Sequence, residues 1–181
     1  GMLEHVFPRS SHNRFEHSLG VSHLAGRYIN ILSNDAFKPS DTDILSVRIA
    51  ALLHDVGHGP FSHIFDTIVD RDKQHEHRSQ KIVEHIFKEI GTSKNFSSAY
   101  IIDSVKEMIE PTQDLKNPLN SIVNNRITKI DVDKFDYLLR DPQHIGISAN
   151  CDYERIFIKS RISRNEIIYD YSVLNNILEL Y

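Results

Sequence analysis

The sequence has no tryptophan and a single cysteine, Cys151, among its 181 residues. One cysteine cannot form an internal disulfide, which excludes a disulfide-stapled scaffold and fits a reducing compartment. The lack of tryptophan, together with an acidic balance, disfavours a platform on which nucleic-acid bases would stack. We therefore expect an intracellular protein, in the nucleus or the cytoplasm, for which nucleic acid is a less favoured partner.

Long hydrophobic runs are also missing. No apolar stretch reaches the roughly 20 residues needed to cross a bilayer, and the N-terminus has no basic segment followed by an apolar one. The formal net charge of −4 gives no overall attraction to phosphate polymers. These absences predict a soluble protein without a membrane partner, in which any contact with phosphate depends on local basic residues.

Hydrophobic residues make up 40% of the chain, which is enough at this length to bury one sizeable core. We therefore expect a single domain over residues 1–181. Gly1 directly before Met2 is typical of a residue left by tag removal, and the chain stops at Tyr181 inside an apolar helical pattern. We expect this domain to be a piece of a longer protein.

Helical spacing of apolar residues recurs along most of the chain. Capping residues before Arg14 and a capping box over 40–43 predict two helix starts, and the second helix ends at the glycines and proline of 57–60. Two segments near the C-terminus, 156–162 and 166–171, predict a β-hairpin. The expected fold is mainly α with this small hairpin. Further helices are expected over 61–69, 76–90, 98–109, 130–140 and from Val173, with a mobile loop over 111–125.

The pair His54 and Asp55 ends the apolar second helix, where an unpaired carboxylate would be costly to bury. His17 lies on an earlier expected helix and Asp133 on a later one. A single histidine is usually a surface or core residue, so the prediction depends on the combination. Two imidazoles and two carboxylates suit one divalent metal ion, Fe, Mn, Ni, Zn or Mg, and favour a catalytic site over a cysteine-rich structural one.

More polar side chains follow these four. His63 and Asp66 are one helical turn apart, so the carboxylate can orient the imidazole as an acid. His75 could join them, while a packing role suits His58 equally well. The remaining histidines are expected at the surface or in the core: His5, His12, His23, His77, His85 and His144.

A polar stripe continues from Asp133 along its helix. Lys134, Tyr137 and Asp141 fall on the same face as Asp133, and an exposed stripe is the ordinary alternative. Asp131 and Asp136 are expected to point elsewhere. One turn before His17, Arg14 could present its guanidinium to a phosphate, the alternative being a surface charge.

Three runs carry a resemblance to a known family: VFPRSSHNRFEHSLGV (6–21), HDVGHGPFSH (54–63) and IDVDKFDY (130–137). They resemble the SAMHD1-like HD-domain deoxynucleotide triphosphohydrolases (dNTPases). The resemblance implies an all-helical HD domain with a minor β element, and hydrolysis of a dNTP to deoxynucleoside and inorganic triphosphate. It implies the metal ligands His17, His54, Asp55 and Asp133, the catalytic group His58, His63, Asp66 and His75, the phosphate and sugar contacts Arg14, Lys134 and Tyr137, and a 3′-hydroxyl contact from Asp141.

Nucleotide-activated members of that family use basic residues near the hairpin to bridge subunits. Arg155 fits this pattern, whereas Asp170 and Ser172 stand where more basic residues would be expected. The resemblance thus implies a dNTP substrate, with a nucleotide activator and a homo-oligomer of the longer protein as further candidate partners.

Two other functions stay open. A metal site does not by itself set the leaving group, so the chain could be an HD phosphohydrolase or phosphodiesterase on a nucleoside monophosphate or a cyclic nucleotide. Lys134 and Tyr137 argue against that choice. It could instead be a non-catalytic module that binds a nucleotide or single-stranded nucleic acid.

Overall fold

The computed structural model describes residues 2–34, 37–69, 74–90, 99–112, 117–148 and 152–181, so Cys151 lies outside the described residues. Helices dominate, and two short strands pair near the C-terminus, which confirms the predicted fold class. In chain order the elements are η1 (Met2–His5), α1 (Arg14–Leu32), α2 (Asp41–Leu53), α3 (His63–Val69), α4 (His75–Ile90), α5 (Ala99–Ile109), α6 (Pro118–Val123), α7 (Val132–His144), α8 (Tyr153–Ile158), β1 (Ser160–Ser163), β2 (Glu166–Tyr169), η2 (Tyr171–Val173) and α9 (Leu174–Leu178).

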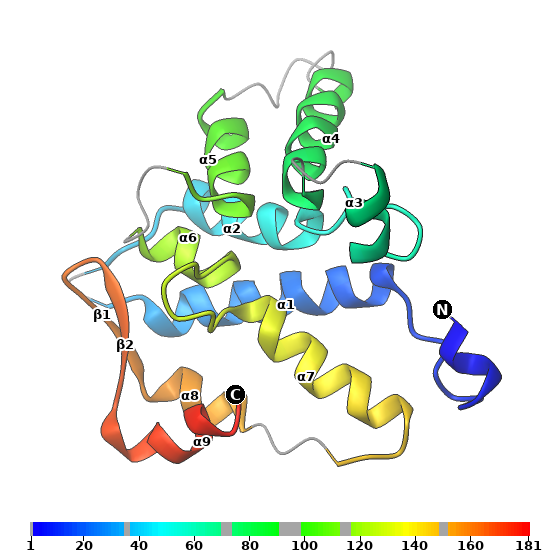
Figure 1. Cartoon of the computed structure of the whole chain (residues 1–181). Helices are drawn as coiled ribbons and strands as arrows, with labels where there is room; N and C mark the ends of the chain where they lie inside the picture. Colours follow the sequence, from blue (N-terminus) through cyan, green and yellow to red (C-terminus); the bar gives the residue numbers. More distant parts are fainter. Residues whose placement is uncertain (1, 35–36, 70–73, 91–98, 113–116, 149–151) are drawn as a thin grey trace.

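Helix α1 runs through the middle of the molecule (Figure 1), with α2, α4 and α5 on one side and α7 and the hairpin on the other. Its start is capped as expected, because the Asn13 side chain accepts a hydrogen bond from the backbone N–H of Glu16 at 3.1 Å. Val21, Tyr28 and Leu32 are completely buried. Because α1 packs against both α2 and α7, it fixes the positions of these two helices relative to each other.

The capping box at the start of α2 is confirmed: the Ser40 side chain accepts from the N–H of Asp43, and the Asp43 carboxylate accepts from the N–H of Ser40. The helix buries Val47 and Ala51 and ends at Leu53. Its end delivers the predicted site residues to the centre of the molecule.

Three predicted element bounds were wrong. The expected loop over 111–125 contains α6, and residues 113–116 lie outside the described residues. The Asn117 side chain caps this helix, and Pro118 lies in its first turn, where a missing backbone N–H costs no hydrogen bond. Helix α7 continues through Pro142, because that proline removes one backbone hydrogen bond close to the helix end.

The third wrong bound is the first half of the expected hairpin. Ile156 and Phe157 belong to α8, capped by Asp152, and both are completely buried. The Phe157 ring stacks on that of Tyr28, so packing against α1 holds this turn of helix in the core. The hairpin itself begins at Ser160 and turns through Arg164 and Asn165, whose positive φ values of 52° and 62° match a tight two-residue turn.

Across the described residues, no helix combines the length and the apolar character that crossing a membrane requires.

Candidate active site

Three of the four predicted metal ligands converge. His17 lies in the first turns of α1, His54 directly follows α2 and Asp133 lies in the first turn of α7. Each offers one ligand atom within 4.8 Å of the others. His17 Nε2 is 3.0 Å from Asp133 Oδ1, and His54 Nε2 is 3.6 Å from the same oxygen. Residues from three helices thus form one small group of nitrogen and oxygen donors.

Asp55 lies at the edge of this group. Its Oδ1 is 3.5 Å from His54 Nε2 and its Oδ2 is 3.7 Å from His17 Nε2. The same carboxylate is paired with the guanidinium of Arg14. The fourth predicted ligand is therefore close enough to join the other three, and a cation already balances its charge.

Both imidazoles have their Nδ1 atoms occupied. His54 Nδ1 is 2.7 Å from the carbonyl oxygen of Ala51, and His17 Nδ1 is 2.7 Å from Asp136 Oδ2. A carbonyl and a carboxylate accept hydrogen bonds, so each Nδ1 carries the proton and each Nε2 is the atom that faces the group. His54 Nε2 is buried and makes no hydrogen bond within the described part of the chain. This donor set fits a divalent metal ion, without choosing among Fe, Mn, Ni, Zn and Mg.

The prediction that Asp131 and Asp136 point elsewhere was wrong. Helix α7 packs against α1, so residue 136, one turn after Asp133, also faces α1. Asp131 caps α7 by accepting from the N–H of Lys134 at 3.0 Å, and it lines the cavity in front of the site. The spacing of three residues from Asp133 was the signal that could have identified Asp136.

The charges around the group suit a cation. Burial raises the pKa of Asp55, but the hydrogen bond from His58 and the neighbouring positive charges outweigh burial and hold that pKa well below its usual range. Burial raises the pKa of Asp133 as well, but the hydrogen bond from His17 and the nearby charges of His17 and His54 outweigh burial and lower that pKa. For His17, burial lowers the pKa, yet the hydrogen bonds to Asp133 and Asp136 raise it to about 9. Two ionised carboxylates therefore face imidazoles whose protons a metal ion would displace.

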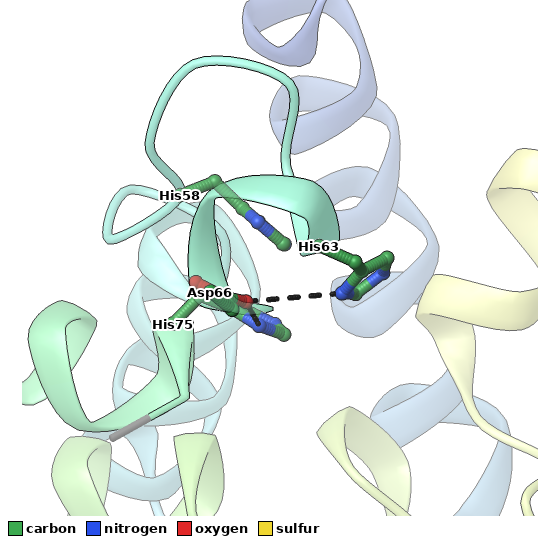
Figure 2. Close-up of side chains that lie close together, drawn as sticks. All are labelled: His58, His63, Asp66 and His75. Carbon is green, nitrogen blue, oxygen red and sulfur yellow. Dashed lines mark ion pairs between the residues drawn. The ribbon is translucent and has the colours of Figure 1, made fainter. Parts of the chain in front are cut away.

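Figure 2 shows a second cluster, which lies close to the first because His58 Nε2 is 3.3 Å from Asp55 Oδ1. His58, His63, Asp66 and His75 each offer one ligand-type atom within 4.8 Å of the others. The rings of His58 and His75 are stacked, with centroids 3.6 Å apart and planes 16° apart. Asp66 Oδ2 is 3.8 Å from His63 Nδ1 and 3.7 Å from His75 Nδ1. The structure thus brings together all four residues of the predicted catalytic group.

The members of this second cluster differ in exposure. The His58 side chain is 3% exposed, whereas that of His63 is 81% exposed. Phe61 and Ser62, just before His63, both have positive φ, which is a strained conformation for residues other than glycine. The carboxylate of Asp66 is held by the guanidinium of Arg78, which lowers the pKa of Asp66. A fixed aspartate therefore lies next to an exposed imidazole.

Close backbone contact joins the two clusters. A side chain at Gly57 would meet the carbonyl oxygen of His75 at 2.2 Å and the backbone nitrogen of Ser79 at 2.4 Å. The Ser79 hydroxyl donates to the carbonyl of His54 at 2.7 Å and accepts from the N–H of Gly57 at 2.9 Å. The start of α4 is thereby fixed against the end of α2.

A cavity of about 740 Å³ opens over both clusters. Of the predicted substrate residues, Arg14, Tyr137 and Asp141 line it, but Lys134 does not. The ammonium of Lys134 instead lies 3.9 Å from the ring centroid of Tyr181. The predicted common face of Lys134 with Asp133 is therefore wrong in this arrangement, since residues one position apart diverge by about 100° on a helix.

One contact of this cavity was not predicted. His12 and His144, both assigned to surface or core, stack on each other with ring centroids 4.1 Å apart. His12 Nε2 is 3.1 Å from Asp141 Oδ1. The pair connects the segment before α1 to the end of α7 and holds the Asp141 carboxylate at the cavity wall.

Comparison with known proteins agrees with this arrangement. The model of the family described as HD domain matches residues 14–141. A "Deoxynucleoside triphosphate triphosphohydrolase SAMHD1 homolog" from Dictyostelium discoideum is 37% identical over 193 residues, covering 100% of this chain and 37% of that protein. The proteins called "Deoxynucleoside triphosphate triphosphohydrolase SAMHD1" in Mus musculus and Homo sapiens are each 39% identical, over 90% and 86% of this chain and 29% of either protein. The chain thus spans about a third of the length of these relatives.

Proposed function

Because the chain belongs to the HD domain family, we propose that it is a metal-dependent hydrolase that converts a dNTP to a deoxynucleoside and inorganic triphosphate. One observation carries this proposal: the His and Asp metal-type group and the imidazoles of the second cluster, His58, His63 and His75, line the same cavity. The relatives that bear the triphosphohydrolase name support the choice of reaction.

We propose His17, His54, Asp55 and Asp133 as the ligands of one divalent metal ion. Their two Nε2 atoms and two carboxylates would leave positions on an octahedral ion for further ligands. Such an ion lowers the pKa of water and polarises a phosphate oxygen. The ligand residues themselves fix the geometry of the site, because they come from α1, from the end of α2 and from α7, and both α2 and α7 pack against α1.

The substrate would lie in the 740 Å³ cavity in front of these ligands. Arg14 now pairs with Asp55 and Ser62, and the same guanidinium can bind a phosphate at that place with two parallel hydrogen bonds. Tyr137 and Asp141 stand further along α7, where a sugar hydroxyl could donate to the Asp141 carboxylate. Lys134 would have to leave the ring of Tyr181 to reach a phosphate.

We propose His63 as the group that gives a proton to the departing 5′-oxygen. Asp66 is 3.8 Å from His63 Nδ1, and catalytic hydrogen bonds that are long without substrate commonly shorten in its presence. Arg78 keeps Asp66 ionised and in place, so the carboxylate can accept from Nδ1 while Nε2 faces the substrate. His58 and His75 form the stacked wall behind this pair.

Product analysis tests the proposal. The chain is incubated with each dNTP and Mn²⁺ or Fe²⁺, and chromatography separates deoxynucleoside, monophosphate and diphosphate, with Asp133→Ala as the control. Deoxynucleoside plus triphosphate, lost in the control, supports the proposed reaction. Monophosphate or diphosphate would instead indicate an HD phosphohydrolase with another leaving group. The position of Lys134, which lies away from the cavity, favours that alternative. Binding without product would indicate a nucleotide-binding module.

A nucleotide activator and a homo-oligomer remain predictions for the longer protein. Arg155, the basic residue near the hairpin, donates a hydrogen bond to the carbonyl of Ser172 at 3.1 Å. A guanidinium has five N–H donors, so others remain for a phosphate. Size measurement with and without each added dNTP would test both predictions in the longer protein.

A further inference from the structure

Asp136 binds the nitrogen of His17 that faces away from the metal-type group. We propose that Asp136, braced by Arg140, positions His17 as a metal ligand. This inference rests on the proposed metal site and deepens it. It does not depend on which nucleotide the protein hydrolyses.

Helix α7 holds the imidazole of His17 from both sides. Asp133 Oδ1 is 3.0 Å from Nε2, and Asp136 Oδ2 is 2.7 Å from Nδ1. The two carboxylates are one turn apart on the same helix, so they approach opposite nitrogens of one ring. Asp136 therefore fixes the tautomer with the proton on Nδ1 and leaves the Nε2 lone pair for a metal ion.

Arg140 makes the Asp136 carboxylate a rigid acceptor. Its Nε donates to Oδ2 and its Nη2 donates to Oδ1, both at 2.8 Å. The Asp136 side chain is 6% exposed, so an unpaired carboxylate there would be costly. The fork of the guanidinium offsets that cost and fixes the plane of the carboxylate. The carboxylate that accepts from His17 Nδ1 is thus held in one orientation.

Gly20 leaves the space that this carboxylate occupies. A Cβ atom at Gly20 would lie 1.9 Å from Asp136 Oδ1 and 2.3 Å from Arg140 Nη2. Gly20 follows His17 by one turn on α1, so the gap opens beside the imidazole. The local sequence of α1 therefore supplies both the ligand and the room for the residue that orients it.

The other imidazole of the group is held differently. His54 Nδ1 donates to the carbonyl of Ala51, three residues earlier on its own helix. That contact depends on local backbone alone, whereas the orientation of His17 depends on the packing of α7 against α1. A change at Asp136 should therefore affect His17 and leave His54 in place.

Metal titration of the whole chain tests this assignment. Asp136→Ala is expected to weaken Mn²⁺ binding, measured by competition with a fluorescent chelator, by about 10-fold to 100-fold. Asp136→Asn should restore much of the affinity, because its side-chain oxygen still accepts from Nδ1. The matched control is Asp103→Ala, an exposed aspartate on α5, which should bind Mn²⁺ like the wild type. Long-range ¹H–¹⁵N NMR spectra, recorded above the raised pKa of His17 so that the ring is neutral, should show that His17 loses its fixed tautomer in Asp136→Ala.

A second pair of variants isolates the contact. Gly20→Ala removes no charge, yet it should lower Mn²⁺ affinity by displacing the carboxylate. In the Asp136→Ala background the same change should have little further effect, because the atom it displaces is gone. Gly26→Ala, on the same helix, meets the flexible side chain of Arg48 at 3.1 Å and serves as the matched control.

The outcomes separate this inference from the proposed function. Circular dichroism first establishes that each variant folds, and if Asp136→Ala does not, Asp136→Asn and Gly20→Ala carry the test. Wild-type Mn²⁺ affinity in a folded Asp136→Ala chain, or equal losses from Gly20→Ala with and without Asp136, would overturn the assignment. A chain that binds Mn²⁺ with this dependence but hydrolyses no dNTP would overturn the proposed reaction and leave the assignment standing. No metal binding by the wild type would overturn both.

Discussion

The two histidine clusters share Asp55 but differ in how firmly their members are held. In the first cluster His17 and His54 are hydrogen-bonded through Nδ1 at 2.7 Å and are mostly buried. In the second, His63 is 81% exposed on the seven-residue helix α3, and its Nδ1 is 3.8 Å from the Asp66 carboxylate. A group that binds a metal needs fixed geometry before the metal arrives, whereas a proton donor can complete its contacts when substrate arrives.

Asp55 couples the two clusters through charge. Its Oδ1 lies 3.3 Å from His58 Nε2 and 3.8 Å from His75 Nε2, and the same carboxylate faces the metal-type group. A change of charge in one cluster therefore alters the electrostatic potential at the other. Variants that remove one function and leave the other intact are the direct way to test the division.

The largest effect is expected from Asp133→Ala, which removes the oxygen that both imidazoles face. Metal affinity and dNTP hydrolysis should both be lost, with kcat/KM falling about a thousandfold or more, equivalent to about 4 kcal/mol of transition-state stabilisation. Metal content by atomic emission and product analysis measure the two losses. Asp103→Ala is the matched control, and a metal-free but fully active variant would remove the first cluster from the mechanism.

A smaller loss, confined to turnover, is expected from His63→Ala. Removing a general acid lowers kcat by about 100-fold to 10,000-fold, while the proposed metal ligands are unchanged and should bind the metal as before. Chelator competition should therefore give wild-type metal affinity beside a much lower kcat. His23→Ala, an exposed histidine on α1, controls for loss of an imidazole. If metal affinity fell as far as kcat, the division between the clusters would be wrong.

Ser79→Ala should lower stability instead of changing either chemistry directly. The variant leaves the buried N–H of Gly57 without its acceptor, at a cost of about 1–3 kcal/mol in the free energy of unfolding. Urea unfolding measures the change. Ser22→Ala loses an exposed hydrogen bond to the carbonyl of Arg48 and should cost much less. Equal costs for the two variants would show that the joint between α2 and α4 is not a rigid support.

The smallest effect is expected at an ion pair outside both clusters. Arg27 donates to Glu154 at 2.6 and 2.8 Å, which lowers the pKa of Glu154. A lowered carboxyl pKa stabilises the fold above the unfolded value of 4.5, and the stabilisation is lost as the pH falls through the folded value. Glu154→Gln should therefore cost at most about 1 kcal/mol at pH 7 and converge with the wild type in acid. A difference that persists at pH 3 would exclude the charge as its cause.

The fold and most elements could be predicted because their signals are local. The capping box of Ser40 and Asp43 depends on neighbouring residues, and α2 begins there as expected. The helix ends at Leu53, four residues before the first of the glycines that were expected to end it. The segment 156–162 was assigned wrongly because short apolar runs fit a strand or a buried helix equally well. Tertiary burial of Ile156 and Phe157 decided for the helix.

The sequence by itself determined which chemistry the chain can hold: the His and Asp residues, their order along the chain, and the helices that carry them. Which atoms of these residues meet was decided by the tertiary structure, because the packing of α7 on α1 brings together side chains more than a hundred positions apart. That packing placed Asp136 against His17 and Lys134 against Tyr181, whereas the sequence predicted that Asp136 would point elsewhere and that Lys134 would face the site. Periodicity describes the faces of a single helix, and the neighbour that each face meets depends on how the helices pack.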